Sequence, residues 1–309
     1  RNLVVRGAPA IGVSGAFGLA LAALQSSSET IDDFLSDLEK AKEILYQTRP
    51  TAINLSWGLE KIYNSAFSQA QQGRTVSEIR DTIIVEAKRM AEEDVNINKK
   101  MGKNGAELFQ NNDTIMTHCN AGALATVGYG TALGVIRATK EIGKNIKVIA
   151  TETRPVQQGS RLTAFELKHD GIDVSLIPDT AVGYTMANGL VNGVVVGADR
   201  ILQTGHVFNK IGTYQVATMA KQHNIPFYVV APLSTFDLES NPEDVTIEQR
   251  DSSEVTGTGD EKTAPDGIDV INPAFDITPP ELISGIITEN GIAKPPYEES
   301  IKKLFEAKK

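Results

Sequence analysis

From about residue 113 onward, short apolar runs alternate with longer stretches of helical character. The apolar runs are nearly continuous in valine, isoleucine and other apolar residues, and they lie at 113–117, 146–151, 172–177, 193–197 and 226–231. The helical stretches between and after them lie at 121–140, 158–170, 180–188 and 210–223. Buried strands separated by helices are typical of a parallel sheet that is covered on both faces. We therefore predict an α/β fold with a doubly wound, Rossmann-like parallel sheet.

The chain before this point shows helical patterns and no strand pattern. Residues 30–47 place apolar side chains at the spacing of one helix face, and Thr30 followed by acidic residues is a typical helix start. Further helices are predicted over 48–67 and, as one helix or two, over 76–109. We therefore predict a mainly helical N-terminal domain over 1–110 and a Rossmann-like α/β domain over 111–309.

Two segments near the C-terminus stand apart from the alternating pattern. The polar stretch 239–268 is rich in acidic residues, Ser, Thr and Gly, and we interpret it as an excursion from the sheet. The stretch 278–291 is predicted to form another helix.

The N-terminal residues 1–26 superficially resemble a secretory signal, because arginines precede a long apolar stretch. However, Arg6 is followed by Gly7, Ala8 and Pro9, which is the pattern of a turn or helix start. The small residues that follow favour a buried, closely packed helix over a membrane span. The chain does not begin with Met, and we expect its natural N-terminus to lie upstream of residue 1.

Charge and cysteine content exclude several classes of protein. The formal net charge of -9 argues against a nucleic-acid surface, which needs clustered Lys and Arg. A single cysteine cannot form an internal disulfide, so nothing indicates an oxidising compartment. We expect a cytoplasmic protein that binds neither nucleic acid nor membrane, and any basic group with a function must act locally.

Polar and reactive side chains follow each predicted strand. In open parallel sheets, ligands bind at the carboxyl ends of the strands. The residues found there are His118-Cys119-Asn120, Glu152-Thr153-Arg154, Pro178-Asp179-Thr180, Gly197-Ala198-Asp199-Arg200 and Pro232-Leu233-Ser234-Thr235. We expect five loops to bring these groups to one edge of the sheet.

Nucleotide and metal sites are not predicted at this edge. The first strand is followed by Asn-Ala-Gly-Ala-Leu-Ala and not by a GxGxxG turn, and the pair Gly128 and Gly130 falls inside the predicted helix 121–140. The four histidines and Cys119 lack the ligand spacing of a zinc site. We therefore predict neither a cofactor nor a metal.

Cys119 and Asp199 each allow two interpretations from the residues alone. A free cysteine is often a small buried hydrophobe, but a thiol at a strand-to-helix turn can be activated by unpaired helix amides. An acidic residue after a strand often caps the next helix, but a partly desolvated carboxyl can act as an acid. A thiol and a carboxyl at one edge suit proton transfer at carbon and oxygen, which is the chemistry of an isomerase. The residues by themselves do not decide between these readings.

Motifs over nearly the whole chain resemble those of the methylthioribose-1-phosphate isomerase family, in the same order. They include RGAPAIGV (6–13), TRPTAINLSWGL (48–59), THCNAGALAT (117–126), TETRPVQQGSRLTAFEL (151–167), VVVGADRI (194–201), NKIGTYQVA (209–217) and APLSTFD (231–237). IEQRDSSEV (247–255) and NPAFDITPPELISGIITENG (272–291) resemble the family too. The family has a further N-terminal segment that precedes the first of these motifs.

The resemblance implies a reaction, a catalytic pair and a substrate site. The reaction is the conversion of 5-methylthioribose 1-phosphate to 5-methylthioribulose 1-phosphate in methionine salvage. The family's catalytic pair falls on Cys119 and Asp199, with Asp199 transferring a proton at the ring oxygen and Cys119 exchanging the proton at C2. The substrate-binding positions fall on Arg6, Gly7, Ala8, Arg49, Gln158, Asn209 and Lys210, and all of these except Ala8 are implied to bind the phosphate. Bidentate guanidinium contacts and helix amides suit a phosphate, and the family is homodimeric.

Two alternatives remain within the same fold. One is an isomerase of ribose 1,5-bisphosphate, which would need a second cationic pocket. The other is a non-catalytic regulatory subunit of the translation-initiation exchange factor, which acts through protein contacts and has no need for the catalytic pair. The presence of both Cys119 and Asp199 favours the enzyme. For Arg154, Arg161 and Arg200, a structural role as ion-pair partners is an equally open alternative to substrate binding.

Overall fold

The computed structural model describes residues 5–50, 52–258 and 261–306. By contacts between residues, the chain divides into two units. The first contains Arg1–Ile97 and Leu124–Gly128, and the second contains Asn98–Ala123 and Tyr129–Lys309. The predicted domain boundary at residue 110 lies just after the end of helix α4, whereas the contact units divide inside that helix.

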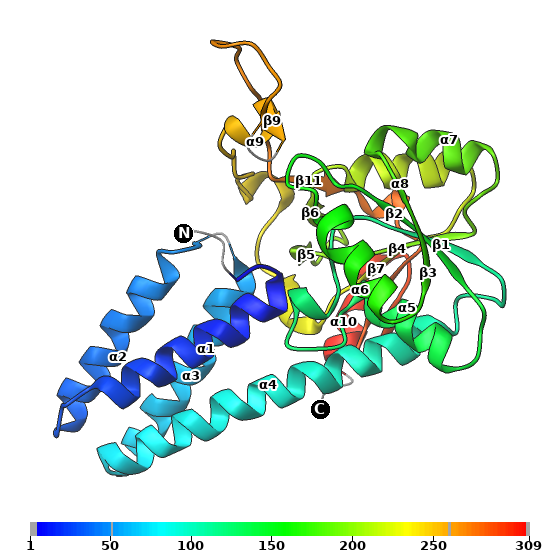
Figure 1. Cartoon of the computed structure of the whole chain (residues 1–309). Helices are drawn as coiled ribbons and strands as arrows, with labels where there is room; N and C mark the ends of the chain where they lie inside the picture. The colour runs from blue at the N-terminus through cyan, green and yellow to red at the C-terminus, as the bar shows by residue number, and fades with distance from the viewer. Residues whose placement is uncertain (1–4, 51, 259–260, 307–309) are drawn as a thin grey trace. The chain divides into compact units, whose positions relative to one another are not determined.

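The first unit is helical (Figure 1). Its helices are α1 (Ala8–Gln25), α2 (Ile31–Tyr46), α3 (Ile53–Gln71) and the first part of α4 (Val76–Ala106). The Thr30 hydroxyl accepts a hydrogen bond from the Asp33 amide at 3.2 Å and so caps α2 as predicted. The segment predicted as one helix or two over 76–109 is a single helix of 31 residues.

The core of this unit is formed where α1, α2, α3 and α4 bury their apolar faces. Its largest fully buried side chains are Phe34, Leu19, Leu38, Leu59, Ile62, Ile79, Ile83 and Met90. Helix α1 packs tightly on α3 through glycines, since a Cβ atom added to Gly58 would lie 2.2 Å from the carbonyl oxygen of Gly12. Among the described residues, α1 is one helix that is long and apolar enough to cross a membrane by length and composition. Core helices pass the same test, and half of the tested window is buried.

The second unit contains a seven-stranded sheet in the order β13-β12-β7-β4-β1-β2-β3. Its strands are β1 (Thr114–Thr117), β2 (Lys147–Thr151), β3 (Asp173–Ile177), β4 (Gly193–Val196), β7 (Phe227–Val230), β12 (Gly285–Thr288) and β13 (Gly291–Ala293). All neighbours are parallel except β12 and β13, which are antiparallel. The prediction of an α/β fold with a helical N-terminal region and a mostly parallel sheet is confirmed.

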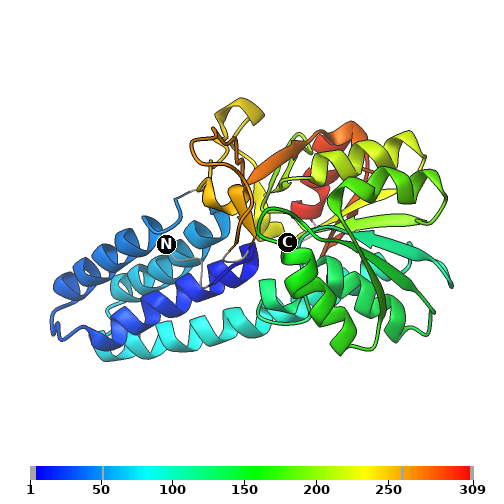
Figure 2. The same cartoon turned by 45° about the horizontal axis from the view of Figure 1, so that its top comes forward.

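Strand order reverses at β1. The chain runs outward from β1 through β2 to β3, and then returns to place β4 on the other side of β1. Met116 is paired with Ile149 of β2 on one side and with Val194 of β4 on the other. The helices of this unit are the end of α4, α5 (Ala132–Glu141), α6 (Ala164–His169), α7 (Val182–Ala187), α8 (Thr213–Gln222), α9 (Ser253–Thr256) and α10 (Tyr297–Glu306). Helices α5 and α6 lie on one side of the sheet, and α7 and α8 lie side by side on the other (Figures 1 and 2).

A smaller sheet, which the sequence patterns did not predict, lies beside the large one. Its order is β11-β6-β5-β8, with β5 (Arg200–Leu202), β6 (Val207–Lys210), β8 (Phe236–Asp237) and β11 (Phe275–Thr278). Strands β5 and β6 form a hairpin directly after β4, so the stretch predicted as a helix over 210–223 begins with the end of a strand. The polar stretch 239–268 contains α9 and a short hairpin of β9 (Gly257–Thr258) and β10 (Glu261–Lys262), and none of its described residues joins the large sheet.

One helix prediction was wrong, and a second was correct only for the later part of its stretch. The stretch 278–291 contains the end of β11, a short 3-10 helix at Pro280–Leu282, β12 and the start of β13. Ile286 and Ile287 of β12 are buried and pair with β7, which favours a strand for these β-branched residues. In the stretch 121–140, the α-helix begins only at Ala132. Tyr129 and Gly130 precede it with φ of 73° and 85°, so they form a left-handed turn and not part of a helix.

Candidate active site

Cys119 and Asp199 lie after the two strands that flank the reversal of strand order. Cys119 follows the end of β1 by two residues, and Asp199 follows the end of β4 by three. Ligands in open parallel sheets bind in the crevice outside the carboxyl ends of such strands. The two loops touch each other, because a Cβ atom added to Gly197 would lie 2.7 Å from the Cβ atom of Ala121. Glycine at position 197 therefore lets the two loops approach closely.

The backbone of Cys119 is held in an unusual conformation. Its φ of 63° lies in the left-handed region, which residues with a side chain rarely adopt. The Cys119 amide donates to Oγ1 of Thr153 at 2.9 Å, and Oγ1 of Thr163 donates to the Cys119 carbonyl at 2.6 Å. Such strain costs about 1–3 kcal/mol and persists only where neighbouring groups enforce it. The thiol is thus presented by a turn that two threonine hydroxyls fix.

His118 anchors this turn from inside the protein. Its Nε2 lies 2.8 Å from the carbonyl oxygen of Ile211, so Nε2 carries the proton and donates it. Its Nδ1 then accepts from Oγ1 of Thr151 at 2.7 Å, and Oγ1 of Thr151 lies 3.2 Å from that of Thr153. Burial lowers the pKa of His118, which keeps the ring neutral and this tautomer in place. His118, which the sequence analysis placed at this edge without a role, therefore supports the position of the neighbouring Cys119.

Asp199 lies at the start of the β5–β6 hairpin. Its amide donates to the carbonyl oxygen of Phe208 at 2.9 Å, which fixes the backbone beside the hairpin. The residue is partly buried, and the preceding strand residues Val194, Val195 and Val196 are fully buried. Asp199 therefore lies three residues beyond a fully buried strand, at a position of intermediate exposure.

Asn209 and Lys210 lie at the end of β6, immediately before α8. The Asn209 side-chain amide donates to Oγ1 of Thr213 at 3.0 Å. The Lys210 ammonium donates to the carbonyl oxygen of Ala274 at 3.1 Å and lies 5.0 Å from the ring centre of Phe275. The charge of Lys210 also lowers the pKa of the nearby carboxyl groups of Glu254 and Asp276, although burial and hydrogen bonds have larger effects on both.

A carboxylate already occupies the start of α8. Asp276 of β11 accepts hydrogen bonds from the amides of Gly212 at 2.7 Å and Tyr214 at 3.1 Å. Burial raises the pKa of Asp276 to about 6, although these two amides favour its ionised form. Because Asp276 takes the helix amides, an anion near the end of β6 would be bound through the side chains of Asn209 and Lys210. The sequence analysis did not identify Asp276, which comes from a strand more than 60 residues downstream.

Gln158 lies beside the loop after β2. It is only 8% exposed, and its Oε1 has no hydrogen-bond partner among the described residues. The next residue, Gly159, lies so close to the Thr151 carbonyl that no Cβ atom would fit there. A buried amide oxygen without a donor is costly, and a ligand hydroxyl group could satisfy it.

The remaining arginines near this edge have structural partners. The Arg154 guanidinium donates to backbone carbonyls, among them that of Val255 at 3.1 Å. Arg200 pairs with Asp237 at 3.3 Å. Arg161 is exposed and donates to the Val156 carbonyl at 3.2 Å. Arg154 therefore anchors the polar excursion. Within the described part of the chain, Arg200 forms an ion pair as the alternative predicted, whereas Arg154 and Arg161 donate to backbone carbonyls.

Arg6, Gly7, Ala8 and Arg49 belong to the helical unit. Gly7 is the N-cap of α1 with φ of 93°, and no side chain caps that helix. Arg49 is partly buried in the connection between α2 and α3. The approach of these four residues to the edge of the sheet stays a prediction. Within the described ranges, no group of three or more His, Cys, Asp or Glu side chains could hold a metal ion.

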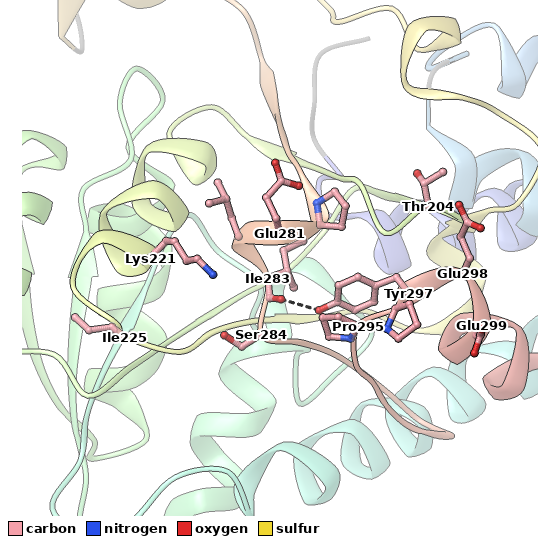
Figure 3. Close-up of a pocket in the computed structure, with 13 residues that line it drawn as sticks. Thr204, Lys221, Ile225, Glu281, Ile283, Ser284, Pro295, Tyr297, Glu298 and Glu299 are labelled. Carbon is pink, nitrogen blue, oxygen red and sulfur yellow. Dashed lines mark hydrogen bonds between the residues drawn. The ribbon is translucent and has the colours of Figure 1, made fainter.

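A separate hollow of about 500 Å³ lies at the opposite ends of the strands (Figure 3). It is lined by residues that precede β7 and β12, such as Ile225 and Ser284, together with Tyr297, whose hydroxyl donates to the Ile283 carbonyl at 2.8 Å. These are the amino ends of the strands, where the ligands of open parallel sheets do not bind. We therefore do not assign the hollow to the reaction.

Comparison with known proteins identifies the family. The chain matches the Initiation factor 2 subunit family over residues 4–295. Curated methylthioribose-1-phosphate isomerases from Thermosipho africanus and Thermotoga maritima are 53% and 51% identical to it, over 99% of this chain and 88% of each relative.

Solved structures agree with this relationship. The 5-methylthioribose 1-phosphate isomerase of Pyrococcus horikoshii is 46% identical with a TM-score of 0.89, over 99% of this chain and 85% of the other. A structure from Archaeoglobus fulgidus titled as the delta subunit of translation initiation factor eIF-2B is 51% identical with a TM-score of 0.85, over 98% and 88% of the two chains. The chain therefore belongs to the Initiation factor 2 subunit family, and within that family to the methylthioribose-1-phosphate isomerases.

Proposed function

We propose that this chain converts 5-methylthioribose 1-phosphate to 5-methylthioribulose 1-phosphate, as a step of methionine salvage. The observation that carries the proposal is the placement of Cys119 and Asp199 after β1 and β4, the two strands that flank the reversal of strand order. The names of relatives that are 53% and 51% identical support the substrate. The single thiol and a partly buried carboxyl supply the two groups that such a reaction needs.

The substrate poses a chemical problem that the pair would solve. Its anomeric oxygen carries the phosphate, so a free aldehyde cannot form by simple ring opening. In our proposal, Asp199 gives its proton to the ring oxygen as the bond between that oxygen and C1 breaks. The positive charge left at C1 is shared with the phosphate-bearing oxygen. This makes the hydrogen at C2 acidic.

Cys119 would then move a proton from C2 to C1. Its thiolate takes the proton from C2, which neutralises the charge and forms a double bond between C1 and C2. The thiol returns a proton to C1, and the hydroxyl on C2 loses its proton to the carboxylate of Asp199, which gives the ketone. Both side chains end in the protonation state in which they started. The competing route moves hydrogen directly from C2 to C1 as hydride.

Deuterium oxide distinguishes these two routes. A thiol proton exchanges with solvent, so the proposal predicts deuterium at C1 of product formed in deuterium oxide. Complete transfer of the original C2 hydrogen to C1 would contradict proton transfer through Cys119 and would indicate the hydride route. Proton NMR spectra of the purified product give the result directly.

The phosphate site is the second part of the proposal. Asn209 and Lys210 supply a side-chain amide and a positive charge for the phosphate near the carboxyl edge. The side-chain NH2 group of Gln158 would donate to the phosphate, while its buried Oε1, which can only accept, would take a hydrogen bond from a sugar hydroxyl group. The family resemblance adds Arg6, Gly7, Ala8 and Arg49. Charge-assisted contacts of this kind fix the orientation of a phosphate as well as binding it.

Turnover of alternative substrates tests the assignment as a whole. The proposal predicts turnover of 5-methylthioribose 1-phosphate and little turnover of ribose 1,5-bisphosphate, since the second phosphate would need another cationic pocket. A preference for the bisphosphate, or no turnover of either sugar phosphate, would contradict it. The proposed enzyme is a homodimer, and a light-scattering mass of one chain at micromolar concentration would count against that part.

A further inference from the structure

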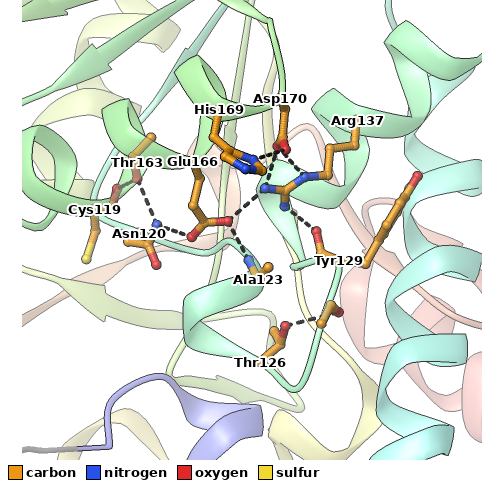
Figure 4. A network of polar contacts seen from close by, with 11 residues as sticks. Cys119, Asn120, Ala123, Thr126, Tyr129, Arg137, Thr163, Glu166, His169 and Asp170 are labelled. Atoms are coloured by element: carbon orange, nitrogen blue, oxygen red, sulfur yellow. Dashed lines mark hydrogen bonds and ion pairs between the residues drawn. The ribbon is translucent and has the colours of Figure 1, made fainter.

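The loop from Cys119 to Ala123 is held by a buried carboxylate on α6. Oε1 of Glu166 accepts a hydrogen bond from the Asn120 side-chain amide at 3.0 Å, and Oε2 accepts one from the Ala123 backbone amide at 2.7 Å (Figure 4). The Glu166 side chain is 5% exposed. The two oxygens thus bind the loop at two points beyond the thiol.

The loop is shaped for this contact. A Cβ atom added to Gly122 would lie 2.4 Å from both carboxylate oxygens of Glu166. Any residue other than glycine at this position would therefore displace the carboxylate or the loop. Thr163 lies three residues before Glu166, just ahead of α6. Its Oγ1 donates to the Cys119 carbonyl at 2.6 Å and lies 3.2 Å from the Asn120 side-chain amide. Glu166 and Thr163 thus hold the loop on both sides of Asn120.

Arg137 of α5 compensates the buried negative charge of Glu166. Its Nη2 donates to Oε2 of Glu166 at 2.8 Å, and its Nε donates to Asp170 at 2.7 Å (Figure 4). A third nitrogen of the guanidinium donates to the Tyr129 carbonyl. A buried carboxylate without such a partner would be strongly destabilising. Arg137 therefore fixes Glu166, and Glu166 in turn fixes the loop.

We propose that Glu166, acting with Thr163, is a positioning residue that enforces the left-handed turn at Cys119 and so aims the thiol at the substrate. This rests on the proposed role of Cys119. The φ of 63° at Cys119 is strained, and the turn would relax if its anchors were removed. A displacement of about 1 Å in a reacting group can lower a rate by roughly 10²-fold.

The variant Glu166→Gln tests the proposal with little change in shape. Three donors, on Asn120, Ala123 and Arg137, would then face one oxygen and one amide nitrogen, so at least one donor would meet another donor. We expect kcat to fall by roughly 10- to 100-fold while KM changes by less than about threefold, because the phosphate contacts are untouched. We also expect faster hydrogen exchange at the amides of residues 119–123, measured by mass spectrometry without substrate.

Asp170→Asn is the matched control. It alters the same Arg137 guanidinium, but no hydrogen bond joins Asp170 to the loop 119–123 among the described contacts. We expect kcat within about threefold of wild type and unchanged exchange in the loop, whatever its effect on melting temperature. Equal losses of kcat and equal loop exchange in both variants would show that Glu166 matters only for stability, and would overturn the proposal.

Thr163 provides a second test if Glu166→Gln does not fold. Thr163→Val removes the hydroxyl that holds the Cys119 carbonyl, and Thr163→Ser keeps it. The proposal predicts loss of kcat and faster loop exchange in the valine variant, with rescue in the serine variant. Failure of serine to rescue would contradict it. Hydrogen exchange is measured without substrate, so faster exchange in the loop supports the anchoring role of Glu166 and Thr163 independently of the reaction. If Cys119→Ser shows the kcat of the wild type, only the proposed reaction fails.

Discussion

The carboxyl group of Asp276 should make the stability of the folded chain fall as the pH rises. Burial raises its pKa from 3.8 to about 6 in the folded protein. The folded state therefore holds this proton more tightly than the unfolded state does. The resulting stabilisation is fully present below about pH 4 and is lost as the pH rises through about 6.

The structure also gives the size of this effect. A difference between 3.8 and about 6 corresponds to about 3 kcal/mol of unfolding free energy. Burial disfavours the ionised carboxylate, whereas the amides of Gly212 and Tyr214 and the charge of Lys210 favour it. The sign of the pH dependence therefore reports which influence is stronger.

Urea denaturation of wild type and Asp276→Asn at several pH values measures this effect. The asparagine variant has no titrating group at this position. The contacts that it loses change the unfolding free energy by the same amount at every pH. We expect the variant to gain up to about 3 kcal/mol relative to wild type between about pH 4 and about pH 7. A constant difference, or a gain by wild type, would refute the reasoning.

Asp237→Asn is the control of opposite sign. Burial opposes ionisation of Asp237, but hydrogen bonds from Ser240 and Glu239 and the charge of Arg200 outweigh it, so the pKa of Asp237 is lowered. Its folded form therefore binds the proton less tightly than the unfolded chain does. Wild type should lose stability relative to Asp237→Asn as the pH falls through the lowered pKa.

Three further predictions concern the helical unit and the phosphate. Gly58→Ala should lower the melting temperature, because overpacking against Gly12 costs roughly 1–3 kcal/mol. Gly183→Ala is the control and should be neutral or stabilising, since its added Cβ atom would lie 3.5 Å from the nearest atom. Equal effects of the two substitutions would contradict the close approach of α1 and α3. Phe34→Ala should cost about 3–5 kcal/mol in denaturant titrations, since the ring is fully buried, and a cost below about 1 kcal/mol would contradict that packing. Arg49→Ala should raise KM by roughly tenfold or more if its guanidinium binds the substrate phosphate, since such contacts contribute about 1.5–3 kcal/mol, and unchanged kinetics would exclude it.

The sheet could be predicted because its central strands β1, β2, β4 and β7 are mostly buried, although the edge strand β3 is largely exposed. Val194, Val195 and Val196 read as a continuous apolar run for this reason, and they lead directly to Asp199. The same rule failed at Ile286 and Ile287, where a short apolar run was taken as part of a helix. Short apolar segments fit either structure by pattern alone, and pairing with β7 decided the outcome.

The hydrogen bonds that hold the site could not be predicted, because they join residues that are far apart in the sequence. The bond between Thr163 and Cys119 joins residues 44 positions apart, and that between Glu166 and Ala123 joins residues 43 apart. Asp276 reaches Gly212 over 64 positions. No local pattern marks a glutamate that will be buried beside an arginine of another helix, so these contacts emerge only from the packed fold.

The central claim is that Cys119 and Asp199 carry out proton transfer. It is tested most directly by the turnover of 5-methylthioribose 1-phosphate by Cys119→Ser and Asp199→Asn, with melting temperatures measured on the same samples. Positioned acid and base groups contribute roughly 10²- to 10⁴-fold in rate. Each folded variant should therefore lose at least about 10²-fold in kcat while still binding substrate. A folded Cys119→Ser protein with the kcat of the wild type would contradict the account.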